Sequence, residues 1–291
     1  MNLKRLYWIG ALLLLFFVGD RAAGWILAQL NESSQFRYTR MYTDQAKSDI
    51  LLLGNSRGLI FYQPYIEEKT GRSTFNLSYN GLPIDLGYTL VADYLDHYPA
   101  PELLLIDISM CDRINRELVS GFNLYAPHSD NISQLIKSYA PEIYYGGQLS
   151  HLFLYNSEVF QRSLYYLNKS DEDWLLDRVI NDNLVQSVED APQLDFNYED
   201  NYLIDELAKT VKLAQSKGVK VKLVVNPYYP PFAQRIKNFS SWMERVEKQT
   251  GLSVGDYTQA VTDRQGFGDY QHLNKYGAKL YIDQLVEDGV F

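Results

Sequence analysis

The sequence contains very few of the side chains that bind metals or form cross-links. Among 291 residues there is one cysteine, Cys111, and there are four histidines. A single cysteine excludes an intramolecular disulfide and a zinc–thiolate site. Four scattered histidines do not make a multi-histidine metal centre, and no glycine-rich phosphate loop follows any predicted strand. We therefore expect no metal, no cofactor and no bound nucleotide.

Positive charge is also scarce. The formal net charge is −9, and the chain has no block of lysine or arginine beyond Lys4 and Arg5. Such a surface repels nucleic acid, which is thereby excluded as a partner. The sequence also lacks internal repeats and low-complexity linkers. Its hydrophobic fraction of 46% suits one sizeable folded core.

An uncharged run lies near the N-terminus. Residues 6–19 contain no charge, and a second apolar stretch follows after Asp20 and Arg21. Taken as one helix from about residue 3 to residue 30, the segment is long enough to span a membrane. No small-x-small cleavage site precedes the charged pair and no cysteine follows the run. These absences favour a retained anchor over a cleaved signal peptide and exclude a lipoprotein.

Lys4 and Arg5 set the expected orientation, because positive residues stay on the cytoplasmic side. We predict residues 1–30 to be a signal anchor with its N-terminus inside, in a bacterial-type inner or cytoplasmic membrane. Residues 31–291 would then form one exported domain that faces the periplasm or the extracellular side. The polar residues 31–47 are expected to be a juxtamembrane connector with a short helix.

Four short apolar runs have the character of strands buried on both faces, and they cover residues 50–53, 73–77, 103–108 and 219–225. Helical spacing of apolar residues occurs between and after these runs, at 84–97, 202–216 and 275–287. The alternation predicts an α/β protein with a parallel sheet covered on both faces, a three-layer α/β/α sandwich. Between residues 113 and 198 the alternation is lost, and we expect an insertion of helices and loops there.

Function in open parallel sheets gathers at the carboxyl ends of the strands, and the first predicted strand ends in Gly54-Asn55-Ser56-Arg57. Free backbone N–H groups and the positive end of a helix dipole converge at such a turn. They stabilise the oxyanion that forms when a hydroxyl attacks a carbonyl. Ser56 is therefore a candidate nucleophile. The alternative is that Ser56 only caps the following helix.

A candidate base lies before the last predicted helix, in the turn Asp269-x-x-His272. A serine hydroxyl is a weak nucleophile unless an imidazole takes its proton, and a carboxylate holds that imidazole in the required tautomer. His272 could instead simply pack against the final helix. A third turn, at Asn80 and Gly81, offers an amide and a backbone N–H to an oxyanion, or is a plain turn.

In this order and spacing, the turns resemble the conserved blocks of the SGNH/GDSL hydrolase family, over roughly residues 48–112 and 219–288. The resemblance implies a flavodoxin-like sheet topology. It also implies Ser56 as the nucleophile, His272 as the general base and Asp269 as the carboxylate that orients it. Gly81 matches the glycine of the second block.

One block departs from the family pattern. Where the family has Gly-x-Asn-Asp, this sequence has Ser109-x-Cys111-Asp112, so a thiol replaces the amide of the oxyanion hole. Losing one such donor costs about 10²–10³ in rate in other enzymes. Asn80 and Asn226 are the candidates to substitute for it.

The layout of an anchor, an exported domain and a degenerate third block resembles members that act on envelope polymers. Among these are the D-alanyl transfer protein of lipoteichoic acid synthesis and the acetyl-transfer proteins of exopolysaccharide systems. The resemblance implies a glycan or acylated polymer as substrate and a multi-spanning membrane O-acyltransferase as a partner. Arg57 would hold a carboxylate or phosphate of the glycan, or else only a backbone carbonyl.

Three functional interpretations stay open. The first is acyl-ester chemistry on an envelope or exported polysaccharide, by transfer or hydrolysis through an acyl-Ser56 intermediate. The second is a non-catalytic glycan-binding or assembly component of a polysaccharide export or modification machine. In that case the 24 tyrosines would serve as platforms for sugars rather than for packing. The third is an unrelated α/β fold, including a thiol mechanism through Cys111.

Overall fold

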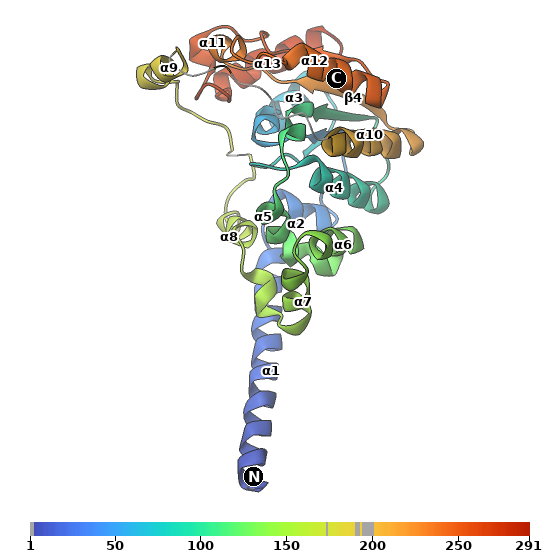
Figure 1. Cartoon of the computed structure of the whole chain (residues 1–291), viewed down its shortest axis with the longest axis vertical. Helices are drawn as coiled ribbons and strands as arrows, with labels where there is room; N and C mark the ends of the chain where they lie inside the picture. Colours follow the sequence, from blue (N-terminus) through green and yellow to red (C-terminus); the bar gives the residue numbers. More distant parts are fainter. Residues whose placement is uncertain (1–2, 173, 190–192, 194–200) are drawn as a thin grey trace. The chain divides into compact units, whose positions relative to one another are not determined.

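The structure is a computed structural model that describes residues 3–172, 174–189, 193 and 201–291 (Figure 1). The chain forms two compact units. Unit 1 comprises residues 1–45 and 116–171, and unit 2 comprises residues 46–115 and 172–291. Most of the predicted insertion thus belongs with the N-terminal segment, whereas the sequence suggests one exported domain. The end of the insertion, at 190–198, lies largely outside the described residues.

Unit 2 is built on five parallel strands: β1 (Ile50–Leu53), β2 (Thr74–Asn76), β3 (Leu103–Asp107), β4 (Lys220–Val225) and β5 (Val254–Asp256). Their order in the sheet is β2-β1-β3-β4-β5. Leu52 of β1 lies opposite Asn76 of β2 on one side and Leu105 of β3 on the other. This is the flavodoxin-like order, with its topological switch point at the carboxyl ends of β1 and β3.

Five helices of unit 2 form the outer layers: α3 (Gln63–Thr70), α4 (Ile84–His97), α10 (Asn201–Ser216), α12 (Phe239–Thr250) and α13 (Lys275–Glu287). Helix α4 packs on α10 and α10 on α12, while α3 packs on α13. Right-handed crossovers that run in opposite directions along a sheet put their helices on opposite faces. The predicted three-layer α/β/α sandwich is confirmed.

The strands follow the apolar runs closely. All four side chains of β1 are fully buried, as a strand covered on both faces requires. The third strand ends one residue earlier than predicted, because Ile108 already belongs to the 3₁₀ helix η2 (Ile108–Asp112). Strand β5 was not predicted, since Val-Gly-Asp is not an apolar run. Asn274 caps α13 as expected, accepting hydrogen bonds from the N–H groups of Tyr276 and Gly277.

Unit 1 is helical. It contains α1 (Leu3–Glu32), α2 (Arg37–Tyr42), α5 (Arg116–Gly121), η3 (Phe122–His128), α6 (Asp130–Tyr139), α7 (Pro141–Leu149), η4 (Leu152–Tyr155) and α8 (Glu158–Tyr165). Helix α1 packs against η4 and α8. In the described part of the chain, α1 is the one helix that is long and apolar enough to cross a membrane, over Lys4–Glu32.

Residues 31–45 of the segment predicted as a polar connector belong to unit 1, and several of them are part of its core. Phe36 and Tyr38 are fully buried. The ring of Tyr38 meets that of Phe122 edge-on at 4.8 Å between centroids. Arg37 forms a buried ion pair with Asp171 at 2.8 Å. The expected short helix is present as α2, but it is held by the helices of the insertion.

Candidate active site

Ser56 lies directly after β1, at the start of the 3₁₀ helix η1 (Ser56–Ile60). The N-cap of η1 is Asn55, whose side-chain oxygen accepts a hydrogen bond from the backbone N–H of Arg57 at 2.9 Å. A Cβ added to Gly54 would lie 2.9 Å from Cα of Gly58, so the tight turn requires glycine. Because Asn55 takes the capping role, the Ser56 hydroxyl is left for another partner.

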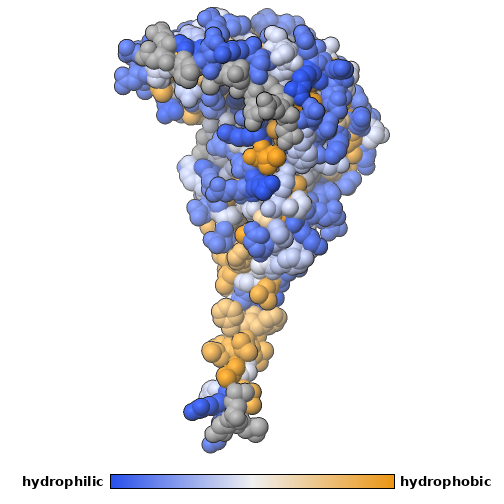
Figure 2. Space-filling view, viewed as in Figure 1, coloured by the Kyte–Doolittle hydropathy of each residue, from blue (hydrophilic) through white to orange (hydrophobic). Residues whose placement is uncertain are grey.

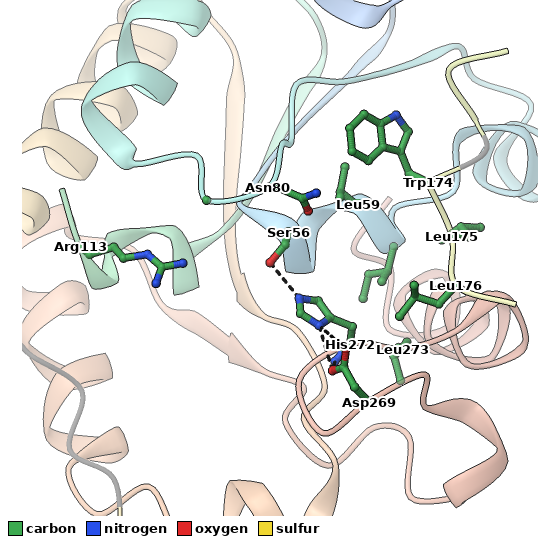
Figure 3. A pocket seen from close by; sticks show the side chains of 12 residues that line it. Ser56, Leu59, Asn80, Arg113, Trp174, Leu175, Leu176, Asp269, His272 and Leu273 are labelled. Carbon is green, nitrogen blue, oxygen red and sulfur yellow. Dashed lines mark hydrogen bonds and ion pairs between the residues drawn. The ribbon is translucent and has the colours of Figure 1, made fainter. Parts of the chain in front are cut away.

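That partner is His272, and the three predicted catalytic residues form one hydrogen-bonded chain (Figure 3). Ser56 Oγ lies 2.8 Å from His272 Nε2. His272 Nδ1 lies 2.9 Å and 3.0 Å from the two carboxylate oxygens of Asp269. With Nδ1–H donating to the carboxylate, Nε2 is the nitrogen that accepts the serine proton. This is the arrangement that activates a serine for nucleophilic attack.

Asp269 is held as a carboxylate. Burial by itself raises the pKa of the group, but hydrogen bonds from the His272 ring and from the backbone N–H groups of Gln271 and His272 more than offset burial. The net result is a lowered pKa for Asp269. Its oxygen Oδ1 accepts those backbone hydrogen bonds at 2.8 and 2.9 Å, which fixes the side chain beneath the imidazole. The Asp269 carboxylate therefore holds the His272 ring in its orientation and places a negative charge beside it.

A cavity of about 390 Å³ opens beside this chain of hydrogen bonds. Ser56, Asp269 and His272 lie on its wall together with Asn80 and Gly81. The rest of the lining is mostly apolar and comprises Leu59, Ile60, Trp174, Leu175, Leu176 and Leu273 (Figure 3). A pocket with a few polar groups on an apolar wall suits a partly apolar small molecule.

The apolar wall from residues 174–176 has no signal in the sequence. It lies in the stretch where the alternation of strands and helices is lost. The backbone carbonyl of Leu176 accepts a hydrogen bond from the N–H of Lys275 at 2.9 Å, which ties the segment to the start of α13. The ring of Trp174 meets that of Tyr79 edge-on at 5.4 Å between centroids. The contacts that place this wall therefore come from elsewhere in unit 2.

Asn80 and Gly81 lie on the wall of the same cavity as Ser56. Gly81 has a φ of 67°, a left-handed conformation that favours glycine. Its carbonyl accepts a hydrogen bond from Asn115 Nδ2 at 2.9 Å. This contact holds the turn in place at the cavity wall. The side chain of Asn80 is exposed and lies on the same wall.

Arg57 and Asn226 are placed differently from the prediction. The guanidinium of Arg57 donates to the backbone carbonyls of Gln271, at 3.0 Å, and of Asn226. It lies 3.2 Å from the ring centre of Tyr228 and is 4% exposed. Of the two roles considered for Arg57, the structure shows the contact with backbone carbonyls. The guanidinium group of Arg57 thus holds the loop that carries His272.

The side chain of Asn226 is fully buried. Its amide nitrogen donates to the carbonyl of Arg57 at 3.1 Å, and its oxygen accepts from the Tyr281 hydroxyl at 2.8 Å. Asn226 lines neither cavity beside Ser56. It therefore does not replace the missing amide of the third block, and the structure corrects that expectation.

Asp107, at the end of β3, lies behind Arg57. Its carboxylate is 3.9 Å from Arg57 Nε and accepts hydrogen bonds from the hydroxyl and the N–H of Ser109, at 2.7 and 3.1 Å. Burial raises the pKa of Asp107, and the charge of Arg57 opposes this shift. Through these contacts Asp107 and Arg57 link the turns that follow β3 and β1.

Cys111 is 1% exposed and lines neither cavity. Burial, reinforced by the charges of Asp112 and Asp107, raises the pKa of its thiol well above the ordinary value. A buried neutral thiol is a poor nucleophile. The geometry therefore gives no support to a thiol mechanism, and Cys111 does not take over the role of the missing asparagine.

Arg113, two residues further on, was missed by the sequence analysis. It lines the first cavity and also a second one of about 200 Å³, which Ser56 borders as well. Its side chain is 65% exposed, and in Figure 3 the guanidinium points toward Ser56. A cation beside the nucleophile at the end of the third block is the feature that the family pattern does not contain.

Two further expectations concern metals and tyrosines. Among the described residues, no group of three or more His, Cys, Asp or Glu side chains is placed to hold a metal ion. The first cavity has no tyrosine in its lining. Many of the tyrosines are instead buried, namely Tyr38, Tyr79, Tyr94, Tyr98, Tyr125, Tyr166, Tyr228, Tyr229 and Tyr281. Packing therefore accounts for this large group of tyrosines.

A scan against protein-family models gives no match, and a search of curated proteins gives none either. Solved structures that resemble this chain include the following two. One, from Streptococcus pneumonia, is provisionally described as a platelet activating factor; it is 11% identical, with 100% of both chains covered and a TM-score of 0.44. The other is a GDSL-like lipase from Bacteroides thetaiotaomicron, 13% identical over 82% of this chain and 88% of that chain, with a TM-score of 0.39. Both TM-scores lie below 0.5, so the fold and site described above rest on strand order and residue geometry.

Proposed function

We propose that the protein is a membrane-anchored serine esterase or O-acyltransferase that acts on acyl esters of an envelope or exported polysaccharide. The observation that carries the proposal is the chain of hydrogen bonds from Ser56 through His272 to Asp269. Side chains from the two ends of unit 2, 216 positions apart in sequence, meet at the carboxyl edge of the sheet. Such a meeting is what acyl transfer through serine requires.

In the first step, Ser56 Oγ attacks the carbonyl carbon of the acyl donor while His272 Nε2 takes the hydroxyl proton. The positive charge that forms on the imidazole is stabilised by Asp269, whose lowered pKa keeps it ionised. Collapse of the tetrahedral intermediate breaks the bond to the leaving alcohol, which receives the proton from His272. The product is an acyl-Ser56 ester.

The oxyanion of that intermediate needs donors. The backbone N–H groups of Ser56 and Gly81 are the first two in this proposal, since both residues line the cavity. The guanidinium of Arg113 and the amide of Asn80 are the groups on the same wall that can complete the site in place of the missing asparagine. A charged donor is a stronger partner for an oxyanion than a neutral amide.

In the second step, a hydroxyl attacks the acyl-Ser56 carbonyl and gives its proton to His272. The second tetrahedral intermediate then breaks the bond between the acyl carbon and Ser56 Oγ, which takes the proton back from His272 Nε2. A sugar hydroxyl gives acyl transfer, and water gives hydrolysis. The apolar wall of Trp174, Leu175 and Leu176 supports transfer, because a site that excludes water suppresses hydrolysis. We therefore favour an acyltransferase whose acceptor is a glycan.

Helix α1 supports the location assigned to this activity. Its apolar length suits a single span, and Lys4 and Arg5 would stay on the cytoplasmic side. Unit 2 would then work outside the inner or cytoplasmic membrane, where a multi-spanning O-acyltransferase is the proposed source of acyl groups.

The test is covalent labelling of the full-length protein in detergent with a fluorophosphonate probe. We expect labelling of the native protein and none of Ser56→Ala. His272→Ala should label far more slowly, because the hydroxyl loses its base. His97→Ala is the matched control, since His97 is at the end of α4, where its ring contacts the carbonyl of Asp93, and lines neither cavity beside Ser56.

The opposite result is also informative. If the folded native protein is not labelled, or if His97→Ala loses as much labelling as His272→Ala, the catalytic proposal fails. The non-catalytic glycan-binding or assembly role would then be the better account, in agreement with the departure at Cys111.

A further inference from the structure

The uncharged and largely exposed stretch of α1 is too short to cross the hydrocarbon core of a membrane. Residues 6–19 carry no charge, and residues 12–19 are all exposed. At 1.5 Å per residue these 14 residues span about 21 Å, whereas the hydrocarbon core is about 30 Å thick. About six more residues of α1 are needed, which carries the span to Trp25. Figure 2 shows the apolar surface of this part of the chain.

The additional turns of α1 are the ones that contact the rest of unit 1. Asp20 is 5% exposed and is the first buried residue of the helix. Its carboxylate accepts hydrogen bonds from Ser150 Oγ at 2.5 Å and from the N–H groups of His151 and Leu152 at 2.8 and 3.2 Å. A chain segment from the insertion is therefore fixed to α1 at a depth that the span has to cover.

Asp20 is also neutralised by its sequence neighbour. Arg21 Nη1 lies 2.5 Å from Asp20 Oδ2, and the same nitrogen donates to the carbonyl of Leu149 at 3.3 Å. A lone carboxylate in the hydrocarbon region costs several kcal/mol, and pairing with donors removes much of that cost. The contacts that fix the insertion to α1 thus also permit this turn of the helix to enter the membrane.

The attached segment has the composition of a membrane interface. Residues 143–157 contain no lysine, arginine, aspartate or glutamate. They include four aromatic residues, Tyr144, Tyr145, Phe153 and Tyr155. Tyrosine is enriched at the boundary between lipid and water, where an amphipathic ring meets both phases.

The same segment exposes large apolar side chains. Leu149, the last residue of α7, is 81% exposed, and Leu152 is 41% exposed. On α1 itself Trp25 is 65% and Ile26 53% exposed. Figure 1 shows α7 at the end of the helical cluster from which the free part of α1 emerges. Exposed apolar side chains therefore occur both on the turns of α1 that the span has to include and on the segment that is fixed to those turns.

We propose that the turn between α7 and η4, residues 149–152, inserts into the outer interfacial layer of the bilayer that α1 spans, so that lipid covers Leu149 and Leu152. Lipid is the occupant because the turn lies beside the part of α1 that must complete the span. The inference rests on the membrane anchor of the proposed function, but not on its serine chemistry. Unit 1 then contacts the bilayer through this turn as well as through α1.

The experiment measures depth in the bilayer. Full-length protein carrying Leu149→Cys is labelled with an environment-sensitive fluorophore and reconstituted in phosphatidylcholine vesicles that contain lipid spin-labelled near the headgroup. Native Cys111 is buried and does not compete for label. Gln134→Cys, on the exposed side of α6 in the same unit, is the matched aqueous control. Leu13→Cys, in the free part of α1, reports the anchor.

We expect the label at 149 to show blue-shifted emission and to lose most of its intensity to the spin-labelled lipid, while the label at 134 shows neither effect. If lipid does not quench the label at 149 while the label at 13 is protected from aqueous quenchers, the inference is overturned and the anchor stays intact. A label at 13 that is open to aqueous quenchers would overturn the anchor as well. A label at 149 with blue-shifted emission but no quenching by lipid means that protein covers the turn, which also overturns the inference.

Discussion

At the scale of single residues, Arg113 is a cation beside Ser56 that the SGNH/GDSL pattern, which the sequence resembles, does not contain. It borders both cavities beside Ser56, at the end of the block where a thiol replaces an amide. For Arg113→Gln we expect kcat for a neutral ester to fall by about 10², with KM little changed, because the oxyanion exists only in the transition state. Steady-state kinetics with p-nitrophenyl acetate measure both constants.

The control for Arg113 is Arg245→Gln, which removes a guanidinium from α12 outside both cavities and should change neither constant. A raised KM with an unchanged kcat for Arg113→Gln would contradict the oxyanion role. It would assign the guanidinium to ground-state binding of the substrate.

Asp269 gives a second prediction at this scale, concerning pH and stability. Its pKa in the folded protein is lowered, so folding favours the ionised form. Its contribution to stability is complete above the unfolded carboxyl pKa of about 3.9 and is lost as pH falls through the lower folded value. We expect Asp269→Asn to reduce the free energy of unfolding at pH 7 and to differ less from the native protein near pH 3. Urea unfolding at both pH values tests this, and an equal difference at both would contradict it.

At the scale of elements, the turn after β2 has a backbone that only glycine adopts easily. Gly81 has a φ of 67°, and an added Cβ would lie 3.0 Å from Asn115 Nδ2. Gly81→Ala should cost about 1–2 kcal/mol of stability and should also lower kcat, because it shifts an oxyanion donor. Thermal unfolding and ester kinetics measure the two effects.

Gly71 provides a matched control for this turn. It ends α3 with a φ of 68°, and nothing lies within 4 Å of a Cβ added there. Gly71→Ala carries the same backbone strain away from the site, so we expect a similar loss of stability with kcat unchanged. A similar loss of kcat in both variants would mean that general destabilisation, and not donor placement, lowers the rate.

The elements that were predictable are those with local signals. The apolar run of β1 and the cap of α13 mark their own boundaries, and both elements appear where the sequence predicts them. Ser56 and His272 follow from the same logic, because each lies in a turn that a neighbouring element defines. The chemistry of a parallel sheet gathers at one edge, so their meeting could also be expected.

The elements that were not predictable depend on partners far along the chain. Arg57 appears beside the nucleophile, yet its partner Gln271 lies 214 positions away. Trp174 comes from a stretch without periodicity and is placed by contacts with the turns of the sheet. Phe36 and Tyr38 look like isolated apolar residues in a polar segment, and only the helices of unit 1 bury them. No short window of sequence contains these contacts.

At the scale of the whole molecule, the proposed catalytic site and helix α1 belong to different units. Every residue of the proposed catalytic site belongs to unit 2, and the elements that contact α1 most, η4 and α8, belong to unit 1. The predicted boundary between anchor and exported domain, at residue 30, lies inside unit 1. It cuts through unit 1, because Asp20 and Gly24 are buried there.

This division predicts how a chain that begins at Asn31 behaves. It lacks the Asp20 carboxylate that binds residues 150–152, and it lacks Gly24, where an added Cβ would lie 2.4 Å from Cβ of His151. We expect limited proteolysis to cut residues 141–157 faster in this chain than in the full-length protein in micelles, because local unfolding costs less there. Labelling of Ser56 should be unchanged, since its triad lies in unit 2. Asp20→Ala in the full-length protein removes the carboxylate that binds residues 150–152 but keeps the helix, so it separates the two losses. Cleavage at the native rate in both variants would show that α1 is a tether and not part of unit 1.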